Sequence, residues 1–376
     1  MRIISISEPE RSAKMKHLNR RSFIRRNAAI AAAGAVGASS SMMPEQAHAT
    51  RKGNIQLAMH LSTRNPDRLK ICRQLGVTHA ITGGPFGRIP RDQYDAAALK
   101  LRDDFAEAGF KIAGIEGHPV PFDKIKRGVD GRDEEIANTI AAIEALSKAG
   151  IDMICYNFMA GIGWHRTNFE IPERGGAMTS EFYYPDAEKK GLTEWGEISE
   201  EKMWDNLTYF LERVIPAAEK WNVKMAAHPD DPPISPLRGI SRILTSADNF
   251  RRLMNIAPSP VNGITFCQAN FRAMGENIYE LGQEFCESGK VFFIHYRDIE
   301  GQAYRFHETF HDNGPTDMPK MLEIYHRAGF CGPIRPDHAP TLAGESGESK
   351  GYGMQGKIFA FGYMIGAMDS RNIPFE

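Results

Sequence analysis

The stretch with the most chemical potential is residues 228–233, His-Pro-Asp-Asp-Pro-Pro, which directly follows the short run Lys-Met-Ala-Ala at 224–227. The run has the length of a buried strand, and the prolines stop regular structure and stiffen the loop that follows. An imidazole and two carboxylates at the end of a strand are unfavourable in a hydrophobic core. Because imidazole is a common ligand of divalent metals, His228 predicts a metal-centred active site.

Three further residues could complete that site. Cys267, His295 and Asp337 each end another short, largely apolar run. Thiolate and imidazole suit Zn, Fe, Co or Mn, and a carboxylate broadens the choice toward Mn or Fe. Taken singly, Cys267 is more simply explained as a core thiol and His295 as a core histidine. All four residues at strand ends together favour a metal site.

These runs belong to a repeated alternation of short apolar and longer amphipathic segments. The apolar runs predict eight strands, at 56–59, 79–82, 111–116, 152–157, 224–228, 263–267, 291–295 and 333–337. The amphipathic segments predict helices, among them 93–108, 134–149, 200–220, 247–255, 277–288 and 317–328. This alternation predicts an α/β fold, a (β/α)8 TIM barrel, with a doubly wound open sheet as the alternative. No Gly-x-Gly-x-x-Gly follows a strand, so no nucleotide cofactor is expected.

A barrel would bring the polar strand ends to one face, where barrel enzymes hold their active sites. The residues at these ends are Glu116, Asn157, His228, Cys267, His295 and Asp337. The longest irregular stretch, 161–195, is predicted to form a loop over that face. No second domain is expected.

Several residues near the strand ends could bind a substrate or move a proton. His338 follows Asp337 and could act as acid or base, with Arg335 as an anion-binding side chain, although Arg-Pro-Asp-His could instead form a surface turn. Tyr352, flanked by two glycines, could move a proton or form an aromatic lid.

A second group of candidates lies in loops. Arg166, in Trp-His-Arg-Thr, could hold a sugar-acid carboxylate in two hydrogen bonds, or it could be a surface arginine. His307 and Asn157 are candidates for substrate contact. Glu308, His311 and their neighbours could orient metal ligands or be merely exposed.

The first 49 residues have the features of an export signal. Arg20-Arg21-Ser22-Phe23 is followed by an apolar stretch at about 28–38 and by Ala47-His48-Ala49, a cleavage signal. The alternatives are a membrane anchor or a basic tail, but the apolar stretch is too short to span a bilayer. The segment predicts a twin-arginine signal peptide, a periplasmic or exported protein, and a single catalytic domain at 50–376.

Composition limits the partners of the remaining chain. The 376 residues include 46 basic and 47 acidic ones, and removing residues 1–49 leaves 38 basic and 44 acidic residues, a net charge of −6. A mildly acidic protein has no electrostatic footprint for nucleic acid, and no later stretch predicts a membrane span. The five cysteines are odd in number and scattered, which argues against a disulfide framework. Barrels of this kind often associate, so the chain could form homo-oligomers.

The motifs resemble those of the mannonate dehydratase family, in the xylose isomerase-like barrel superfamily. The matching pieces run in order over roughly residues 70 to 370: 155–159, 164–167, 224–233, 239–242, 262–267, 306–308, 317–318, 335–338 and 351–352. The chain departs from the family pattern at Ala339, which is usually glycine, and at 268–270, usually Thr-Gly-Ser. Its segment between the fourth and fifth strands is also shorter.

The resemblance implies a hydro-lyase of hexuronate breakdown that converts D-mannonate to 2-keto-3-deoxy-D-gluconate. It implies Mn²⁺ or Fe²⁺ held at the positions of His228, Cys267, His295 and Asp337. Arg166, His338 and Tyr352 would take part in substrate binding and proton transfer.

An elimination across C2 and C3 needs such a set. The metal would stabilise the developing negative charge, Arg166 would hold the carboxylate, and Tyr352 or His338 would take the C2 proton while the other protonates the leaving hydroxyl. The alternatives are a sugar isomerase, an epimerase or a keto-sugar lyase on the same barrel, and a periplasmic sugar-binding protein. A carboxylate clamp at Arg166 would favour sugar acids.

Overall fold

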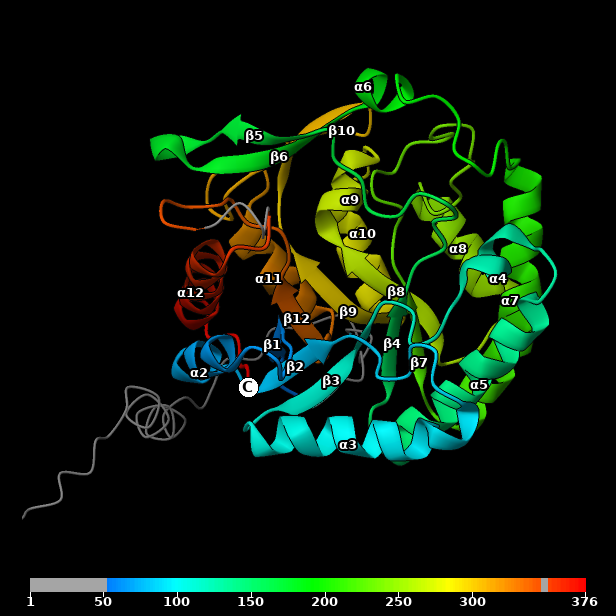
Figure 1. Ribbon diagram of the computed structural model, residues 1–376. Coiled ribbons are helices and arrows are strands. Elements are labelled where there is room, and N and C mark those ends of the chain that lie inside the picture. The colour runs from blue at the N-terminus through cyan, green and yellow to red at the C-terminus, as the bar shows by residue number, and fades with distance from the viewer. Residues whose placement is uncertain (1–52, 346–350) are drawn as a thin grey trace, which may run out of the picture. The chain divides into compact units, whose positions relative to one another are not determined.

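A closed parallel barrel forms the centre of the molecule (Figure 1). The computed structural model describes residues 53–345 and 351–376, and within them eight strands join in the order β1-β12-β9-β8-β7-β4-β3-β2. Their bounds are β1 Gln56–His60, β2 His79–Thr82, β3 Lys111–Glu116, β4 Met153–Tyr156, β7 Lys224–Ala227, β8 Asn262–Cys267, β9 Val291–Tyr296 and β12 Pro333–Pro336. The predicted barrel and its eight strands are confirmed.

The barrel strands are buried on both faces, which explains why they read as apolar runs rather than alternating ones. One large hydrophobic cluster combines strand residues with helix residues. A second cluster takes its members from strands alone: Ala58, Ile81, Ala113, Met153, Cys155, Ala226, Phe292 and Phe293. Because its members come from strands around the barrel and from no helix, the second cluster lies inside the barrel.

Helices surround the barrel, each following a strand (Figure 1). They are α2 Pro66–Gln74, α3 Tyr94–Glu107, α5 Arg132–Lys148, α7 Glu200–Lys220, α8 Ala247–Ile256, α10 Ile278–Glu287, α11 Met318–Arg327 and α12 Met354–Ser370. The side chains of Ser199, Ser246 and Asp317 accept hydrogen bonds from backbone N–H groups in the first turns of α7, α8 and α11. Such caps satisfy donors that have no partner inside the helix. The six helices predicted by residue range are confirmed.

A four-stranded antiparallel sheet is built from the loops after β4 and β9. Its order is β10-β11-β6-β5, with β5 Asn168–Pro172, β6 Met178–Tyr183, β10 Ile299–Gln302 and β11 Arg305–Glu308. The prediction that 161–195 is an irregular loop is therefore wrong, since the segment carries β5, β6, the 3-10 turn Arg174–Gly176 and α6 Tyr184–Glu188. The pairing of Phe182 with Phe306 joins segments far apart in sequence, so local patterns did not reveal it.

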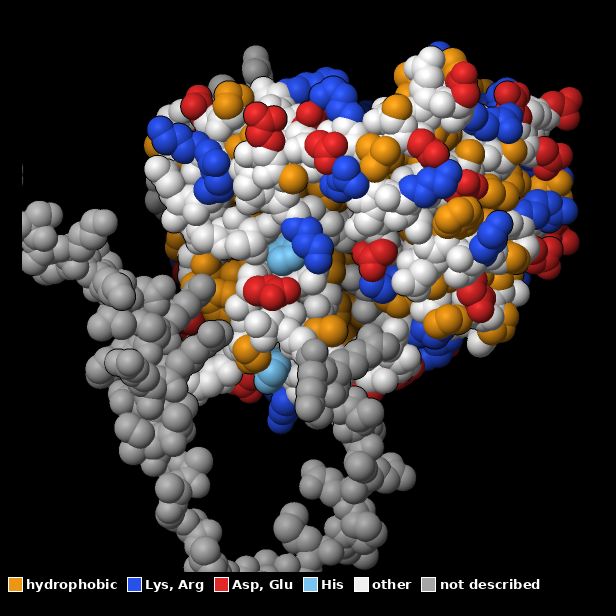
Figure 2. All heavy atoms as spheres, turned by 90° about the horizontal axis from the view of Figure 1, so that it is seen from below, with side chains coloured by type: hydrophobic (Ala, Val, Ile, Leu, Met, Phe, Trp, Pro, Cys, Tyr) orange, Lys and Arg blue, Asp and Glu red, His pale blue; other side chains and the backbone are white. Residues whose placement is uncertain are grey.

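Surface charge, helix hydrophobicity and free thiols bear on the possible partners. Figure 2 shows the molecule from below the view of Figure 1, and on this face acidic and basic side chains are interspersed. Among the described residues, no helix combines the length and apolar character needed to cross a bilayer. The predicted signal peptide, residues 1–49, lies outside the described residues. All five cysteines are free thiols.

Candidate active site

Three side chains of ligand type meet at the carboxyl ends of neighbouring barrel strands. The donor atoms of His228, Cys267 and His295 all lie within 4.8 Å of one another. His228 follows β7, Cys267 ends β8, and His295 is the penultimate residue of β9. Cys267 and His295 are register partners of β8 and β9, which directs their side chains to the same face. We call these three residues the open cluster.

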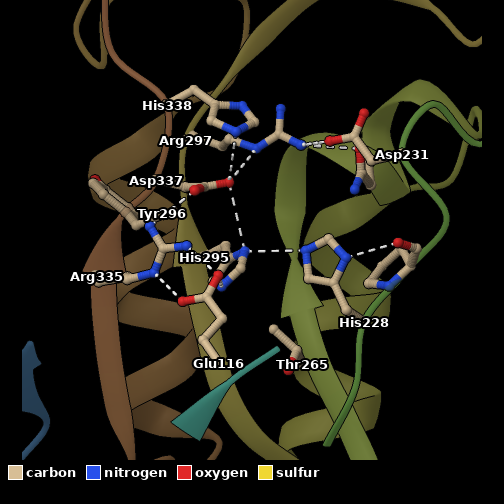
Figure 3. A network of polar contacts seen from close by, with 12 residues as sticks. Glu116, His228, Asp231, Thr265, His295, Tyr296, Arg297, Arg335, Asp337 and His338 are labelled. Atoms are coloured by element: carbon tan, nitrogen blue, oxygen red, sulfur yellow. Dashed lines mark hydrogen bonds and ion pairs between the residues drawn. The ribbon is translucent and has the colours of Figure 1, made fainter. Parts of the chain in front are cut away.

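The two histidines of the open cluster face each other. Nε2 of His228 lies 3.1 Å from Nδ1 of His295 (Figure 3). Nδ1 of His228 is 2.7 Å from the Pro229 carbonyl oxygen, so it carries the proton and donates it there, which leaves Nε2 with a lone pair. Burial lowers the pKa of His228, and burial, with Arg335 as the next cause, lowers the pKa of His295 well below its usual range. Both rings are therefore neutral near pH 7.

This arrangement fits a single divalent cation. Two imidazole nitrogens at about 2.0–2.1 Å from one ion in a tetrahedral site are separated by roughly 3.4 Å, close to the observed 3.1 Å. Burial raises the pKa of the Cys267 thiol to about 12, with only partial compensation from Arg297. A cation that binds the sulfur must therefore displace a proton, which makes metal binding dependent on pH.

Asp337, the fourth predicted ligand, lies beside the open cluster rather than within it. Its Oδ2 is 3.5 Å from Nδ1 of His295 and 2.9 Å from Nε of Arg297, and its Oδ1 is 2.8 Å from Nη1 of Arg335 (Figure 3). Burial alone would raise the pKa of Asp337, but interactions with His338, Arg335 and other neighbours outweigh it and hold the pKa well below its usual range. Asp337 is therefore a carboxylate held by two arginines.

A second polar group, the arginine–carboxylate cluster, consists of Arg166, Arg297, Asp231 and Glu308. Arg297 donates to Asp231 at 2.7 Å and to the two Glu308 oxygens at 2.9 and 3.0 Å. Arg166 donates to Asp231 at 2.5 Å and to Glu308 at 2.6 Å. All four side chains are almost fully buried. Burial would raise the pKa values of both carboxyls, but the arginines, joined by His338, hold them below their usual range.

The geometry corrects the predicted role of Arg166. Its side chain has no exposed surface, and both terminal nitrogens already bind carboxylates of this chain. It is also outside the set of residues that line the central cavity. Arg166 is thus positioned to hold Asp231 and Glu308 in place, and a substrate carboxylate needs another partner.

His338 and Tyr352 form a hydrogen-bonded chain with Glu308. Nδ1 of His338 lies 2.8 Å from Oε1 of Glu308, and Nε2 lies 2.7 Å from the Tyr352 hydroxyl. Burial, reinforced by Asp337, raises the pKa of Tyr352 well above its usual range, so the phenol keeps its proton. The most direct assignment is that His338 donates Nδ1–H to Glu308 and accepts from Tyr352 at Nε2. A carboxylate that orients an imidazole in this way also stabilises its protonated form.

The two histidines of the open cluster and the His338–Tyr352 pair line one cavity of about 450 Å³, a size that suits a small ligand. Asp337, Asn157 and Arg335 line it as well, as do His60, Arg68 and Lys357, which the sequence did not single out. Arg335 is bound to Glu116 by Nε at 2.9 Å and by Nη2 (Figure 3). Asn157 accepts from Lys126 at 2.9 Å.

His307 does not join the site. It lies on β11, with its Nε2 3.6 Å from Glu173 and 3.8 Å from Glu300, and it is absent from the cavity lining. Side chains alternate along a strand, so Glu308 points to the buried cluster while His307 points away from it. Of the two neighbours, Glu308 is the one that reaches the chemistry.

Two residues that the sequence did not single out have recognisable signals. Arg297 follows His295 by two positions, a spacing that keeps side chains on one face of a strand. Lys357 is the single charged residue between Met354 and Met368 of an otherwise apolar helix, and a buried lysine of that kind is rare without a role.

Comparison with known proteins establishes the family. The model of the family described as D-mannonate dehydratase (UxuA) matches residues 61–193 and 186–374. This chain belongs to the D-mannonate dehydratase family. It is therefore an enzyme of the hydro-lyase class.

Individual relatives agree with that assignment. A mannonate dehydratase of Streptococcus uberis is 34% identical over 81% of this chain and 95% of its own length. The crystal structure of mannonate dehydratase from Streptococcus suis serotype 2 superposes with a TM-score of 0.74 and 26% identity, covering 86% of this chain and 96% of that one. A 3-keto-D-glucoside 4-epimerase of E. coli has a TM-score of 0.55 at 10% identity, covering 83% of this chain and 100% of that one, a likeness of fold alone.

Proposed function

We propose that this enzyme dehydrates D-mannonate, or a related aldonate, to 2-keto-3-deoxy-D-gluconate by β-elimination. The observation that carries the proposal is the His338–Tyr352 hydrogen bond of 2.7 Å in the cavity that His228 and His295 also line. A paired base and acid beside a metal-type site is what an elimination next to a carboxylate needs. Membership of the D-mannonate dehydratase family supplies the substrate class.

The reaction removes the proton from C2, breaks the bond between C3 and its oxygen, and releases water. In the proposed mechanism His338 takes the C2 proton, because its ring is oriented by Glu308, which offsets the positive charge that forms. Tyr352 gives its proton to the departing hydroxyl, because its raised pKa keeps it protonated at neutral pH. The enol product tautomerises to the 2-keto acid, so no redox cofactor is consumed.

The proposed ion is Mn²⁺ or Fe²⁺, held by His228, Cys267 and His295 with Asp337 as the fourth ligand. When bound, the ion supplies a Lewis acid that stabilises negative charge on substrate oxygens. Arg297 keeps Asp337 oriented through the 2.9 Å contact of its Nε, and orientation of ligands by such contacts tunes metal affinity.

The decisive experiment is anaerobic incubation of the purified protein with Mn²⁺ and a panel of aldonates, followed by an assay for 2-keto-3-deoxy acids. Product from D-mannonate or a close epimer is expected. Product from none of the aldonates would overturn the dehydratase proposal, while an isomerised or epimerised sugar in the same samples would favour the alternative chemistry of this barrel.

We further propose that the enzyme works in the periplasm or outside the cell after twin-arginine export. Support comes from Arg20-Arg21 and the Ala-His-Ala motif at 47–49. Cell fractionation of the wild type and of the Arg20→Lys/Arg21→Lys variant tests this. The wild type should be recovered outside the cytoplasm and the variant inside it; equal cytoplasmic retention of both would refute export.

A further inference from the structure

Lys357 is a buried cation that lacks a carboxylate partner among the described residues. It lies in the first turn of α12, is 2% exposed, and lines the central cavity. Its Nζ donates to the Pro336 carbonyl oxygen at 3.1 Å, and no ion pair of Lys357 occurs within residues 53–345 and 351–376. Burial, with Arg335 as the next cause, lowers the pKa of this lysine to about 7. The amine is therefore only partly protonated near pH 7, and an anionic ligand beside Nζ would favour the charged form.

Arg68 presents a second cation to the same cavity. It lies on α2, and its Nη2 donates to the Tyr352 carbonyl oxygen at 3.1 Å. Its Nε is buried without a hydrogen-bond partner in the described part of the chain. Arg68 also makes no ion pair there, whereas the third cavity-lining cation outside the histidines, Arg335, is held by Glu116 and Asp337.

The two cations flank Tyr352. The Nζ atom of Lys357 is 5.1 Å from the centre of the Tyr352 ring, and Arg68 binds the backbone of the same residue. The Tyr352 hydroxyl in turn contacts His338. A carboxylate held by Lys357 and Arg68 would therefore have its neighbouring carbon next to the pair proposed to move protons.

We propose that Lys357 and Arg68 form the subsite that receives the carboxylate of the substrate and selects sugar acids over neutral sugars. The inference rests on the proposed function and deepens it, since it names the residues that recognise the acid. It also replaces Arg166, whose nitrogens are taken by Asp231 and Glu308. An ammonium and a guanidinium on one carboxylate form charge-assisted hydrogen bonds, the stronger class of such bonds.

The test compares Lys357→Met with Lys357→Arg, and Arg68→Met with Arg68→Lys, in the metal-loaded full-length protein. Calorimetry measures binding of D-mannonate and of the neutral polyol D-mannitol, and the keto-acid assay measures turnover. Each methionine variant should weaken D-mannonate binding on the order of 10- to 100-fold, with D-mannitol binding and metal content unchanged. The charge-conserving variants should recover part of the loss.

Lys290→Met is the matched control. The ammonium group of Lys290 also donates a hydrogen bond to a backbone carbonyl, that of Ser259, but Lys290 lies just before β9, at the amino end of the barrel. The Lys290→Met variant should bind D-mannonate as the wild type does. If Lys357→Met does not fold, as judged by circular dichroism, Arg68→Met carries the test, because Arg68 is only partly buried.

The outcomes separate the subsite from the reaction. Charge-dependent binding of D-mannonate without product in the wild type would uphold the subsite and reject the dehydratase. Turnover that is unchanged in Lys357→Met and Arg68→Met, with unchanged D-mannonate affinity, would overturn the subsite and leave the dehydratase standing. A wild-type protein that binds the polyol as tightly as the acid would also overturn it.

Discussion

The open cluster and the arginine–carboxylate cluster are both buried and lie side by side, yet they differ in whether their polar groups have partners within the chain. Each charged group of Arg166, Arg297, Asp231 and Glu308 is matched by a partner within the cluster. In the open cluster, by contrast, two neutral imidazole nitrogens face each other at 3.1 Å beside a thiol. A buried polar group whose partners all lie within the chain stabilises the fold. A buried polar group that lies beside a cavity and lacks such partners can bind a ligand.

The two clusters meet at His338, where we expect the largest effect. His338 binds Glu308 of one cluster and is adjacent in sequence to Asp337, which contacts the other. His338→Asn and Tyr352→Phe should each lower kcat by roughly 10²- to 10⁴-fold, the usual contribution of a positioned acid or base. Steady-state kinetics on the best aldonate, with thermal unfolding as a check of folding, measures this. A kcat within threefold of the wild type would remove the residue from the proton transfer.

Substitutions in the arginine–carboxylate cluster should lower the stability of the fold. Arg297→Met leaves Asp231, Glu308 and Asp337 buried with fewer counter-charges, which should lower the free energy of unfolding by about 3–5 kcal/mol. Urea unfolding measures the change. Arg251→Met is the matched control, because Arg251 also binds two carboxylates but at the surface, and it should cost about 1 kcal/mol or less. Equal effects of the two substitutions would show that burial of the cluster is not what matters.

The open cluster should respond to metal. A divalent cation at about 100 times its Kd should raise the free energy of unfolding of the wild type by about 2.7 kcal/mol. Cys267→Ser should lose most of this gain and most of the bound metal, whereas Cys286→Ser, a buried thiol on α10, should keep both. Elemental analysis and thermal unfolding with and without a chelator provide the measurement. Full metal content in Cys267→Ser would exclude the sulfur as a ligand.

Acid should have the smallest effect, and it acts through His311, a buried histidine outside both clusters. Burial lowers the pKa of His311 to about 4, so between pH 6.5 and 4 the unfolded chain binds a proton that the folded chain does not, and stability falls as pH falls. The pKa values of Asp231 and Glu308 lie below their usual range, so their contribution persists above about pH 4 and is lost only below it. His311→Gln should therefore remove about 2 kcal/mol of the loss seen by pH 4.5. Urea unfolding between pH 6.5 and 4.5 measures the free energy of unfolding of both proteins. If the variant loses stability with falling pH as steeply as the wild type does, the assignment to His311 is contradicted.

The sequence predicted the barrel because its strands are continuous apolar runs with polar ends, a pattern that local reading detects. His228, Cys267 and His295 were recognisable for the same reason, as they end three such runs. The partners of Arg166 were not, since Asp231, in the loop after β7, and Glu308, at the end of β11, are 65 and 142 residues away. A guanidinium looks the same in sequence whether it binds a substrate or a buried carboxylate, and only the fold decides between them.

The four-stranded sheet of β10, β11, β6 and β5 has a consequence for the order in which the site forms. The contact between Arg166 and Glu308 spans 142 residues of chain, and β6 pairs with β11 across a similar interval. Contacts that close such long loops form late, because the loss of chain entropy precedes the gain from contact. A growing chain therefore has no oriented His338 until β11 and Tyr352 have been made. A chain that ends before Tyr352 therefore lacks one member of the proposed proton-transfer pair, however much of the barrel it has formed.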